Sequence, residues 1–298
     1  MKKTLIALAA LTPALVASNG HAADLPAMKT PPAALPTPIW KGFYVGLNAG
    51  GNWGNDSSIS ANTYPVGSLA QGNAAYWAMG NRAISGSSQG GFLGGGQVGY
   101  NWQPGLLNNN LIFGFEADIQ GVAAGNGNRN YTTAYTVGNT SLIDTTTANS
   151  QLQFLGTVRG RVGYLATPTL LVYGTGGVAY GGVSFNATNY VNAFAASGAQ
   201  TWTGIGSTSA SDVNVGYAAG GGAEWMFMPN WSAKAEYLYY NLGNLNAQLN
   251  SALYAMSASP ASQPFRTTNL SGQVNGNVVR LGVNYHFSSA PKPVVAKF

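Results

Sequence analysis

The sequence predicts an all-β protein, an eight-stranded antiparallel up-and-down transmembrane β-barrel with four long extracellular loops. Three observations support this fold class. Eight segments alternate hydrophobic with small or polar residues at a period of two, their connections alternate between short and long, and their few charged residues share one face. This combination is typical of strands that have one face in lipid and the other in a polar lumen.

Residues 1–22 have the features of a secretory signal peptide. Lysines follow the first residue, the run 5–16 is apolar, and Gly20 and Ala22 are small residues before a cleavage point. The apolar run is shorter than the ~20 residues that a membrane-anchor helix requires. We therefore expect an exported chain rather than one held by a helix.

The composition agrees with a β-rich membrane protein. Charged residues make up 7% of the chain, yet its mean hydropathy is +0.01, lower than is usual for helical membrane proteins. Because there is no cysteine, something other than disulfides must stabilise the exported chain, and barrel closure with lipid burial is one such means. Removal of Lys2 and Lys3 with the signal lowers the net charge from +5 to +3, and no basic cluster remains, so we expect no nucleic-acid partner.

The remaining chain divides into three parts. Five prolines in 23–39 predict a Pro-rich periplasmic linker that cannot join a sheet. The barrel is expected over 40–287, and a short periplasmic tail over 288–298 follows it. The predicted strands are 43–51, 92–102, 111–123, 151–165, 170–184, 213–226, 231–241 and 277–287.

The connections between these strands alternate in length. The short ones are 103–110, 166–169 and 227–230, and the long ones are 52–91, 124–150, 186–212 and 242–276. Outer-membrane barrels have short periplasmic turns and long extracellular loops. The alternation therefore predicts that the N-terminus and the C-terminus are both periplasmic.

Charged residues in the predicted strands lie on the face opposite to the lipid candidates. They are Glu116, Asp118, Arg159, Arg161, Glu224, Lys234, Glu236 and Arg280. In 151–165, for example, Leu152, Phe154 and Val158 are expected to face lipid, whereas Gln153 and Arg159 face the lumen. A Lys or Arg facing lipid at mid-bilayer costs about 2–4 kcal/mol. This cost explains why the charged residues all lie on the face opposite to the lipid-facing residues.

Two interpretations of this balanced charge set remain open. One is a salt-bridged network that fills the narrow interior of an eight-stranded barrel. The other is a path for protons or ions. Equal numbers of acids and bases favour the network, because an unpaired buried charge is costly.

The other motifs in the sequence give little support for a catalytic or ligand-binding site. Residues 94–99 match the dinucleotide fingerprint G-x-G-x-x-G, but they lie inside an alternating segment, so we interpret them as strand glycines that relieve crowding. His286, alone in the mature chain, is expected to pack or hydrogen-bond. No set of side chains has the pattern of a catalytic, metal or cofactor site, so we expect a protein without enzymatic activity or cofactors.

Aromatic residues mark the strand ends and the loops. Near the short-turn end, an interfacial belt is predicted at Trp40, Trp102, Tyr164, Trp225 and Trp231. Loop aromatics include Tyr64, Tyr131, Tyr190, Trp202 and Tyr254. They either pack the loops or bind a partner such as haem or a host ligand.

The first and last predicted strands resemble those of a known family. The motif Trp-Lys-Gly-Phe-Tyr-Val-Gly-Leu-Asn-Ala-Gly-Gly at 40–51 is similar to the first strand of the alphaproteobacterial major outer-membrane proteins. These form the surface-immunogenic, RopB-like group, related to the opacity-type and OmpA-like porin family. The segment 277–287 and the Pro-rich tail ending Val-Val-Ala-Lys-Phe resemble their C-terminal ends.

The resemblance implies a Gram-negative outer-membrane protein in contact with outer-membrane lipid and lipopolysaccharide. It also implies that Arg280, Gly282, Tyr285 and Phe287 form the sorting signal read by the barrel-assembly machinery, although eleven residues follow Phe287. We expect a structural, surface-antigenic and porin-like role with a lumen plugged by salt bridges. The alternatives are a narrow solute-diffusion porin and loop-borne binding of haem or a host ligand.

Overall fold

The computed structural model describes residues 40–55, 58–66, 82–85, 90–107, 109–124, 127–255 and 262–287. The predicted signal peptide, linker and C-terminal tail lie outside these residues. In the part of the chain that is described, no helix has the length and apolar character needed to cross a membrane.

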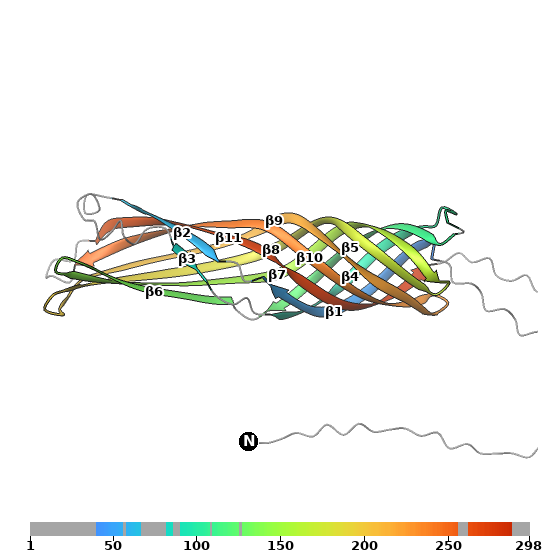
Figure 1. Ribbon diagram of the computed structural model, residues 1–298, viewed down its shortest axis with the longest axis horizontal. Coiled ribbons are helices and arrows are strands. Elements are labelled where there is room, and N and C mark those ends of the chain that lie inside the picture. Colours follow the sequence, from blue (N-terminus) through green and yellow to red (C-terminus); the bar gives the residue numbers. More distant parts are fainter. Residues whose placement is uncertain are drawn as a thin grey trace, which may run out of the picture. The chain divides into compact units, whose positions relative to one another are not determined.

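Eight antiparallel strands close into a ring (Figure 1). In ring order they are β1 (Gly42–Gly54), β4 (Gly91–Trp102), β5 (Leu111–Ala124), β7 (Thr140–Thr167), β8 (Leu170–Ala195), β9 (Gln200–Met228), β10 (Trp231–Ala255) and β11 (Ser262–Phe287). Pairing of β1 with β11, from Phe43 opposite Phe287 to Gly54 opposite Gly276, closes the ring. Each of these strands contains one predicted strand, so the predicted fold class is confirmed.

The long connections, which were predicted as loops, consist largely of further β-structure. Strands β7 to β11 are 25–29 residues long and continue well past the ends of β1, β4 and β5. Three additional strands occur in the first two long connections: β2 (Ile59–Pro65), β3 (Arg82–Ile84) and β6 (Gly127–Val137). The sequence predicted only that these connections are long, and the structure shows that they form β-hairpins.

These hairpins extend the first barrel as a curved sheet, which we call the upper barrel, and the two share β7 to β11. Among the described strands no ladder joins its edges β3 and β6. In the upper barrel β6 pairs with β7, β2 with β11, and β3 with β2. Figure 1 shows β2, β3 and β6 along one half of the shared strands and β1, β4 and β5 along the other half. Arg82 of β3 lies over the ring of Tyr131 of β6, 5.4 Å from its centroid, and so brings the two edges of the upper sheet together.

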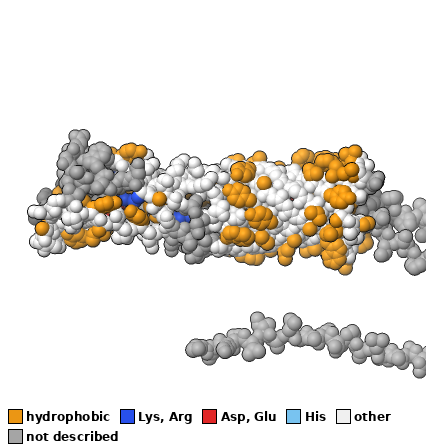
Figure 2. All heavy atoms as spheres, in the orientation of Figure 1, with side chains coloured by type: hydrophobic (Ala, Val, Ile, Leu, Met, Phe, Trp, Pro, Cys, Tyr) orange, Lys and Arg blue, Asp and Glu red, His pale blue; other side chains and the backbone are white. Residues whose placement is uncertain are grey.

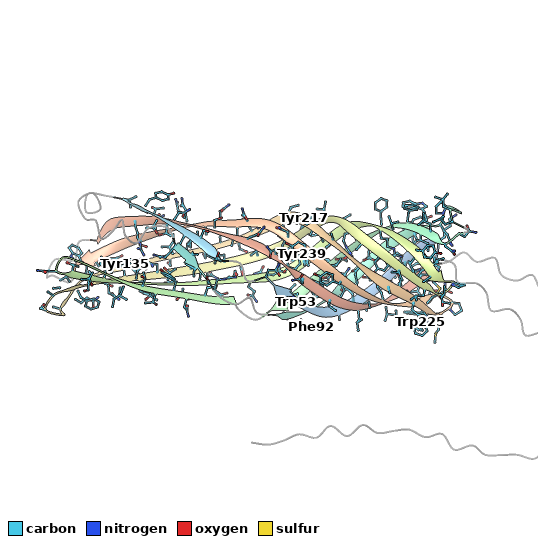
Figure 3. All side chains as sticks on the ribbon, viewed as in Figure 1. Trp53, Phe92, Tyr135, Tyr217, Trp225 and Tyr239 are labelled. Carbon is cyan, nitrogen blue, oxygen red and sulfur yellow. The ribbon has the colours of Figure 1, made fainter. Side chains whose placement is uncertain are left out.

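On the face that Figure 2 shows, the outer surface of the lower barrel carries two bands of hydrophobic side chains. An upper aromatic ring consists of Trp53, Phe92, Tyr217 and Tyr239, whereas Trp225 lies at the short-turn end (Figure 3). Along β1, Trp53 follows the exposed Phe43 by ten residues. A tilted transmembrane strand needs about 9–11 residues, so the two bands are spaced as a bilayer requires.

The ladder between β9 and β10 is interrupted above the upper aromatic ring. Pairing stops at Asn241 opposite Tyr217 and resumes at Ser251 opposite Gly206. At the start of this unpaired stretch β10 contains a bulge, where Gly243 has a φ of 77°. Unpaired backbone groups are very costly in hydrocarbon but can be hydrated beyond it, so the position of the break at the bilayer boundary is physically consistent.

One part of the predicted parity is wrong. Leu152 is buried and Gln153 is exposed, the reverse of the expectation. The register between β7 and β8 shifts between Leu152 and Phe154, and this bulge inverts the alternation on its upper side. Below the bulge, Val158 faces outward and Arg159 inward as predicted.

The glycine motif at 94–99 lies within the antiparallel strand β4. Gly99 faces the ring of Tyr44, and a Cβ atom at Gly99 would approach that ring to 2.2 Å. The glycine therefore makes room for a tyrosine that is fully buried in the lumen. The packing of Gly99 against Tyr44 therefore agrees with the interpretation of the motif as strand glycines rather than as a dinucleotide-binding loop.

We expect Gly99→Val to displace Tyr44 and to lower the temperature at which the folded, fast-migrating form is lost in unboiled gel samples. Overpacking of this kind typically costs about 1–3 kcal/mol. The matched control is Gly96→Val in the same strand, where the nearest atom to a new Cβ is 3.8 Å away. Equal transition temperatures for the two variants would contradict the packing role of Gly99.

Candidate functional site

A layer of charged side chains fills the lumen of the lower barrel. Its eight members come from five strands: Glu116 and Asp118 from β5, Arg159 and Arg161 from β7, Glu224 from β9, Lys234 and Glu236 from β10, and Arg280 from β11. All eight are buried, with at most 5% of each residue exposed. We call this set the charged layer.

Arg159 lies at the centre of the charged layer. Its Nη2 atom is 2.7 Å from Glu116 Oε1 and 2.8 Å from Asp118 Oδ2, and its Nη1 atom is 3.2 Å from Glu236 Oε1. Arg280 reinforces the same group, with Nη2 2.9 Å from Asp118 Oδ2 and Nε donating to Glu236 Oε2 at 2.7 Å. Two guanidinium groups therefore bridge carboxylates on β5 and β10.

The remaining cations complete the pairing. Lys234 Nζ is 2.7 Å from Glu116 Oε1, and Arg161 Nη1 is 2.9 Å from Glu224 Oε2. Each of the four carboxylates thus has a cationic nitrogen within 2.9 Å. Removal of charges from water is expensive, and close pairing with further hydrogen bonds offsets that cost.

Neutral side chains supply those further hydrogen bonds. Tyr44 donates to Glu116 at 2.7 Å, Tyr173 to Glu236 at 3.0 Å, and Thr157 to Asp118 at 2.8 Å. The Arg161 guanidinium also lies over the Tyr44 ring, 4.8 Å from its centroid. Sequence patterns did not single out these three residues, because a hydroxyl on the lumen face carries no distinctive spacing.

The structure contradicts the predicted interfacial position of Trp40. It is fully buried and packs inside the short-turn end with Ile112, Leu165, Leu171 and Met226. Its Nε1 atom donates to the Pro168 carbonyl at 3.0 Å. Trp40 precedes β1, and the strand alternation that places an aromatic outward does not apply to it.

The other predicted belt residues lie on the outside. Trp102, Tyr164, Trp225 and Trp231 are 43–54% exposed. In the predicted assembly signal, Arg280 points into the charged layer, Phe287 is exposed and Tyr285 is partly exposed, with the two ring centroids 5.1 Å apart. The recognition of these residues by an assembly machinery stays a prediction.

His286 is buried between the charged layer and Trp40. Its Nε2 atom lies 2.9 Å from Ser232 Oγ and 3.1 Å from Glu224 Oε1. A catalytic Ser-His-acid arrangement needs the acid on the other ring nitrogen, and here both partners meet the same one. Within the described ranges, no three His, Asp or Glu side chains are grouped to hold a metal ion.

A second ion cluster lies in the upper barrel and was not predicted. Asp144 of β7 is fully buried, 2.8 Å from Arg82 Nη1 of β3 and 2.7 Å from Arg266 Nη1 of β11. Asn189 of β8 donates to the same carboxylate. This cluster, which we call the hairpin clasp, joins segments from all four long connections.

The hairpin clasp also controls the ionisation of its carboxyl group. Burial by itself would raise the pKa of Asp144, but the Arg266 and Arg82 guanidinium groups outweigh burial and hold that pKa below its ordinary value of 3.8. The sequence reasoning missed the clasp because its members lie in segments expected to be loops.

The closed ring, the two hydrophobic bands and the charged lumen together define a transmembrane β-barrel of the kind found in bacterial outer membranes. A family model described as "Outer membrane protein beta-barrel domain" matches residues 22–287. The chain belongs to this family of outer-membrane β-barrel proteins.

Two curated relatives agree with that assignment. The "31 kDa outer-membrane immunogenic protein" of Brucella melitensis is 33% identical over 296 residues, covering 96% of this chain and 100% of the relative. The "22 kDa outer membrane protein" of Rhizobium leguminosarum is 26% identical over 226 residues, covering 74% of this chain and 72% of the relative.

Among solved structures, the outer membrane protein OprG of Pseudomonas aeruginosa matches with a TM-score of 0.38 and 12% identity, covering 84% of this chain and 99% of OprG.

We expect Arg159→Met to destabilise the barrel by about 3–5 kcal/mol, because it leaves buried carboxylates without their central cation. Urea unfolding of protein refolded into lipid vesicles, followed by tryptophan fluorescence, measures the change. Lys41→Met removes an exposed cation and serves as the control, with an expected change within about 0.5 kcal/mol. A similar stability for the two variants would argue against a tightly paired layer.

We expect Asp144→Asn to loosen the upper barrel at neutral pH by about 1–3 kcal/mol, since a carboxylate paired with two guanidinium groups is lost. The folded-state pKa of Asp144 is lowered, so its stabilisation is complete above pH 3.8 and is lost as the pH falls through the lower folded value. The difference between the variant and the natural protein should therefore shrink in strong acid.

Hydrogen exchange of the β6–β7 amides at neutral and acid pH measures this effect. The control is Asp212→Asn, which changes an exposed carboxylate on β9. If Asp144→Asn and Asp212→Asn left the protection of these amides equally unchanged at neutral pH, the clasp would have no stabilising role.

Proposed function

We propose that this outer-membrane protein is a structural, surface-exposed barrel whose lumen is closed to solutes. The observation that carries the proposal is the charged layer, in which eight side chains from five strands pair with one another and are at most 5% exposed. A hydrated ion passing through would have to separate several of these pairs in a low-dielectric interior.

Apolar packing on both sides of the charged layer supports the same conclusion. Below it, Trp40 and its neighbours occupy the short-turn end. Above it, Leu93, Leu155, Val183 and Leu238 belong to a hydrophobic cluster that continues into the upper barrel. A continuous column of water is unfavourable through such a sequence of layers.

We further propose that the short turns face the periplasm and that the upper barrel projects from the cell. Outer-membrane barrels usually have this orientation, and it would expose the hairpins to the surroundings. The Brucella melitensis relative is called immunogenic, which is consistent with a surface-antigen role here.

The two alternative functions have less support. A diffusion porin needs an open lumen, and wide aqueous channels occur in barrels of about sixteen strands. Loop-borne ligand binding was suggested by aromatic residues, but Tyr131 and Trp202 pack against hydrophobic clusters. Tyr64, Tyr190 and Tyr254 are exposed and remain candidates for contact with a partner.

Planar-bilayer recordings test the closed lumen. We expect no reproducible single-channel steps from the folded protein, because the charged layer blocks hydrated ions. A wide diffusion porin inserted in the same bilayers gives the positive control, and heat-modifiable gel migration verifies that the sample is folded. Reproducible conductance steps from the folded barrel would overturn the proposal in favour of a narrow porin.

A further inference from the structure

Uncharged polar side chains cover the outer face of β10 and β11 above the upper aromatic ring. They form successive cross-strand rows and alternate along the strands with buried residues such as Leu249 and Leu270. The rows are Asn241–Asn275, Asn244–Gln273, Asn246–Ser271, Gln248–Asn269 and Asn250–Thr267. We call this set the amide ladder, because eight of its ten members are Asn or Gln.

Strand β2 widens the amide ladder on the side of β11. Its outward residues continue three of the rows with further polar side chains and one aromatic ring. The added pairs are Ser60–Ser271, Asn62–Asn269 and Tyr64–Thr267. Tyr64 is 53% exposed, so an accessible ring lies beside the row that is farthest from the membrane.

The requirements of the fold do not explain this composition. Asn is depleted in strands, because its side chain competes with the ladder for backbone groups. A protein surface in water normally has charged residues at about 25–35% of its positions. On the described parts of β2, β10 and β11 the Lys, Arg, Asp and Glu residues all point inward, and each is at most 4% exposed: Lys234, Glu236, Arg266 and Arg280. The outer face is therefore suited to a partner that is rich in hydroxyl groups rather than in charge.

The amide ladder has hydrogen-bonding capacity beyond its internal contacts. Gln248 Nε2 donates to Asn269 Oδ1 at 3.3 Å, and Thr267 Oγ1 donates to Asn250 Oδ1 at 2.8 Å. These bonds orient the side chains but use only part of what each amide offers, since an amide has two N–H donors and a carbonyl acceptor. Donors and acceptors side by side match the hydroxyl groups of sugars, which both donate and accept.

The border of the amide ladder along β10 adds backbone groups. Pairing between β9 and β10 stops at Asn241 and resumes at Ser251. Backbone N–H and C=O groups that point toward β9 in this stretch have no ladder partner there, so they require water or a ligand to satisfy them. A ligand rich in hydroxyl groups can supply both kinds of partner.

The amide ladder begins at the upper aromatic ring. Asn277 of β11 pairs with Trp53 and Tyr239 of that ring (Figure 3), and it accepts a hydrogen bond from Tyr237 Oη at 2.7 Å. Thr267 lies ten residues before Asn277, which corresponds to about 30 Å of strand. The surface therefore extends from the bilayer boundary through the layer in which the sugars of outer-leaflet lipids lie.

We propose that the amide ladder binds neutral sugars of the lipopolysaccharide that surrounds the barrel in its own membrane. The proposal rests on the orientation given under the proposed function, with the upper barrel projecting from the cell. Sugar hydroxyls exchange hydrogen bonds with the amides of β10 and β11, and the C–H face of a sugar ring packs on Tyr64. Phosphorylated sugars fit less well, because the described outer face of these strands has no guanidinium or ammonium group to pair with phosphate.

Calorimetry on the full-length protein in phospholipid nanodiscs tests the proposal. The probe is a neutral O-polysaccharide released from lipopolysaccharide by mild acid, which has no acyl chains and so does not insert into the bilayer. We expect saturable binding of this probe and at least tenfold weaker binding of a phosphorylated core oligosaccharide. Empty nanodiscs give the blank.

Two sets of variants locate the surface. Gln248→Ala with Asn269→Ala should weaken binding about tenfold, because two side chains that bind hydroxyls are lost. The matched control is Thr132→Ala with Thr145→Ala, an outward hydrogen-bonded pair on β6 and β7. Tyr64→Ala should weaken binding about threefold or more, whereas Tyr64→Phe, which keeps the ring, should retain it. Heat-modifiable migration verifies that each variant is folded.

Three results in nanodiscs would overturn the proposal. They are absence of saturable binding of the neutral O-polysaccharide, equally tight binding of the phosphorylated core, and equal affinities for the β10–β11 variant and the β6–β7 control. None of them depends on orientation, because both sides of a nanodisc are open to the probe.

A peptide tag inserted at Gly138 tests the orientation separately. We expect an antibody to reach the tag on intact cells. A tag that is not accessible would overturn the orientation, and with it lipopolysaccharide of the outer leaflet as the ligand, even if the nanodiscs bound the probe. An accessible tag without binding in nanodiscs would overturn the sugar-binding inference alone and leave the proposed function standing.

Discussion

Arg159 meets carboxylates from β5 and β10 inside the ring, and this contact follows from the size of the barrel. Eight strands enclose a space that is just wide enough to be filled by side chains. Lipid outside excludes charge, so the polar residues of the strands must point inward, where they have one another as partners. Strand closure, charge balance and the inward position of the charged residues in the described lower barrel all depend on this constraint.

The constraint also explains why the transmembrane strands could be predicted. Where lipid covers one face, a two-residue alternation is enforced by energy, as in Val279, Leu281 and Val283 of β11. Beyond the bilayer both faces of a strand tolerate polar residues, so the Ser- and Thr-rich stretch 207–212 resembles a loop in sequence. The extensions of β7 to β11 were missed for that reason.

The candidate site, like the strands, could be predicted from the sequence only in part. Parity indicated which face the charged residues occupy, but the partner of each cation depends on strand stagger, which no sequence pattern specifies. Leu152 and Gln153 were assigned to the wrong faces because a bulge inverts the alternation locally. Trp40 was wrongly predicted to lie outside because it precedes the first strand, and a single aromatic residue without a periodic context could equally lie inside or outside.

The continuous strands of the upper barrel restrict how this part of the protein can vary. Because its hairpins are walls with an inside and an outside, gain or loss of a single residue within β8 or β9 would turn every following side chain to the opposite face. Length changes should therefore occur in steps of two residues along the strands, or at the tips. The turns at Gly138 and Gly198, both with positive φ and open space around them, are positions where a foreign peptide could be inserted without disturbing the strands.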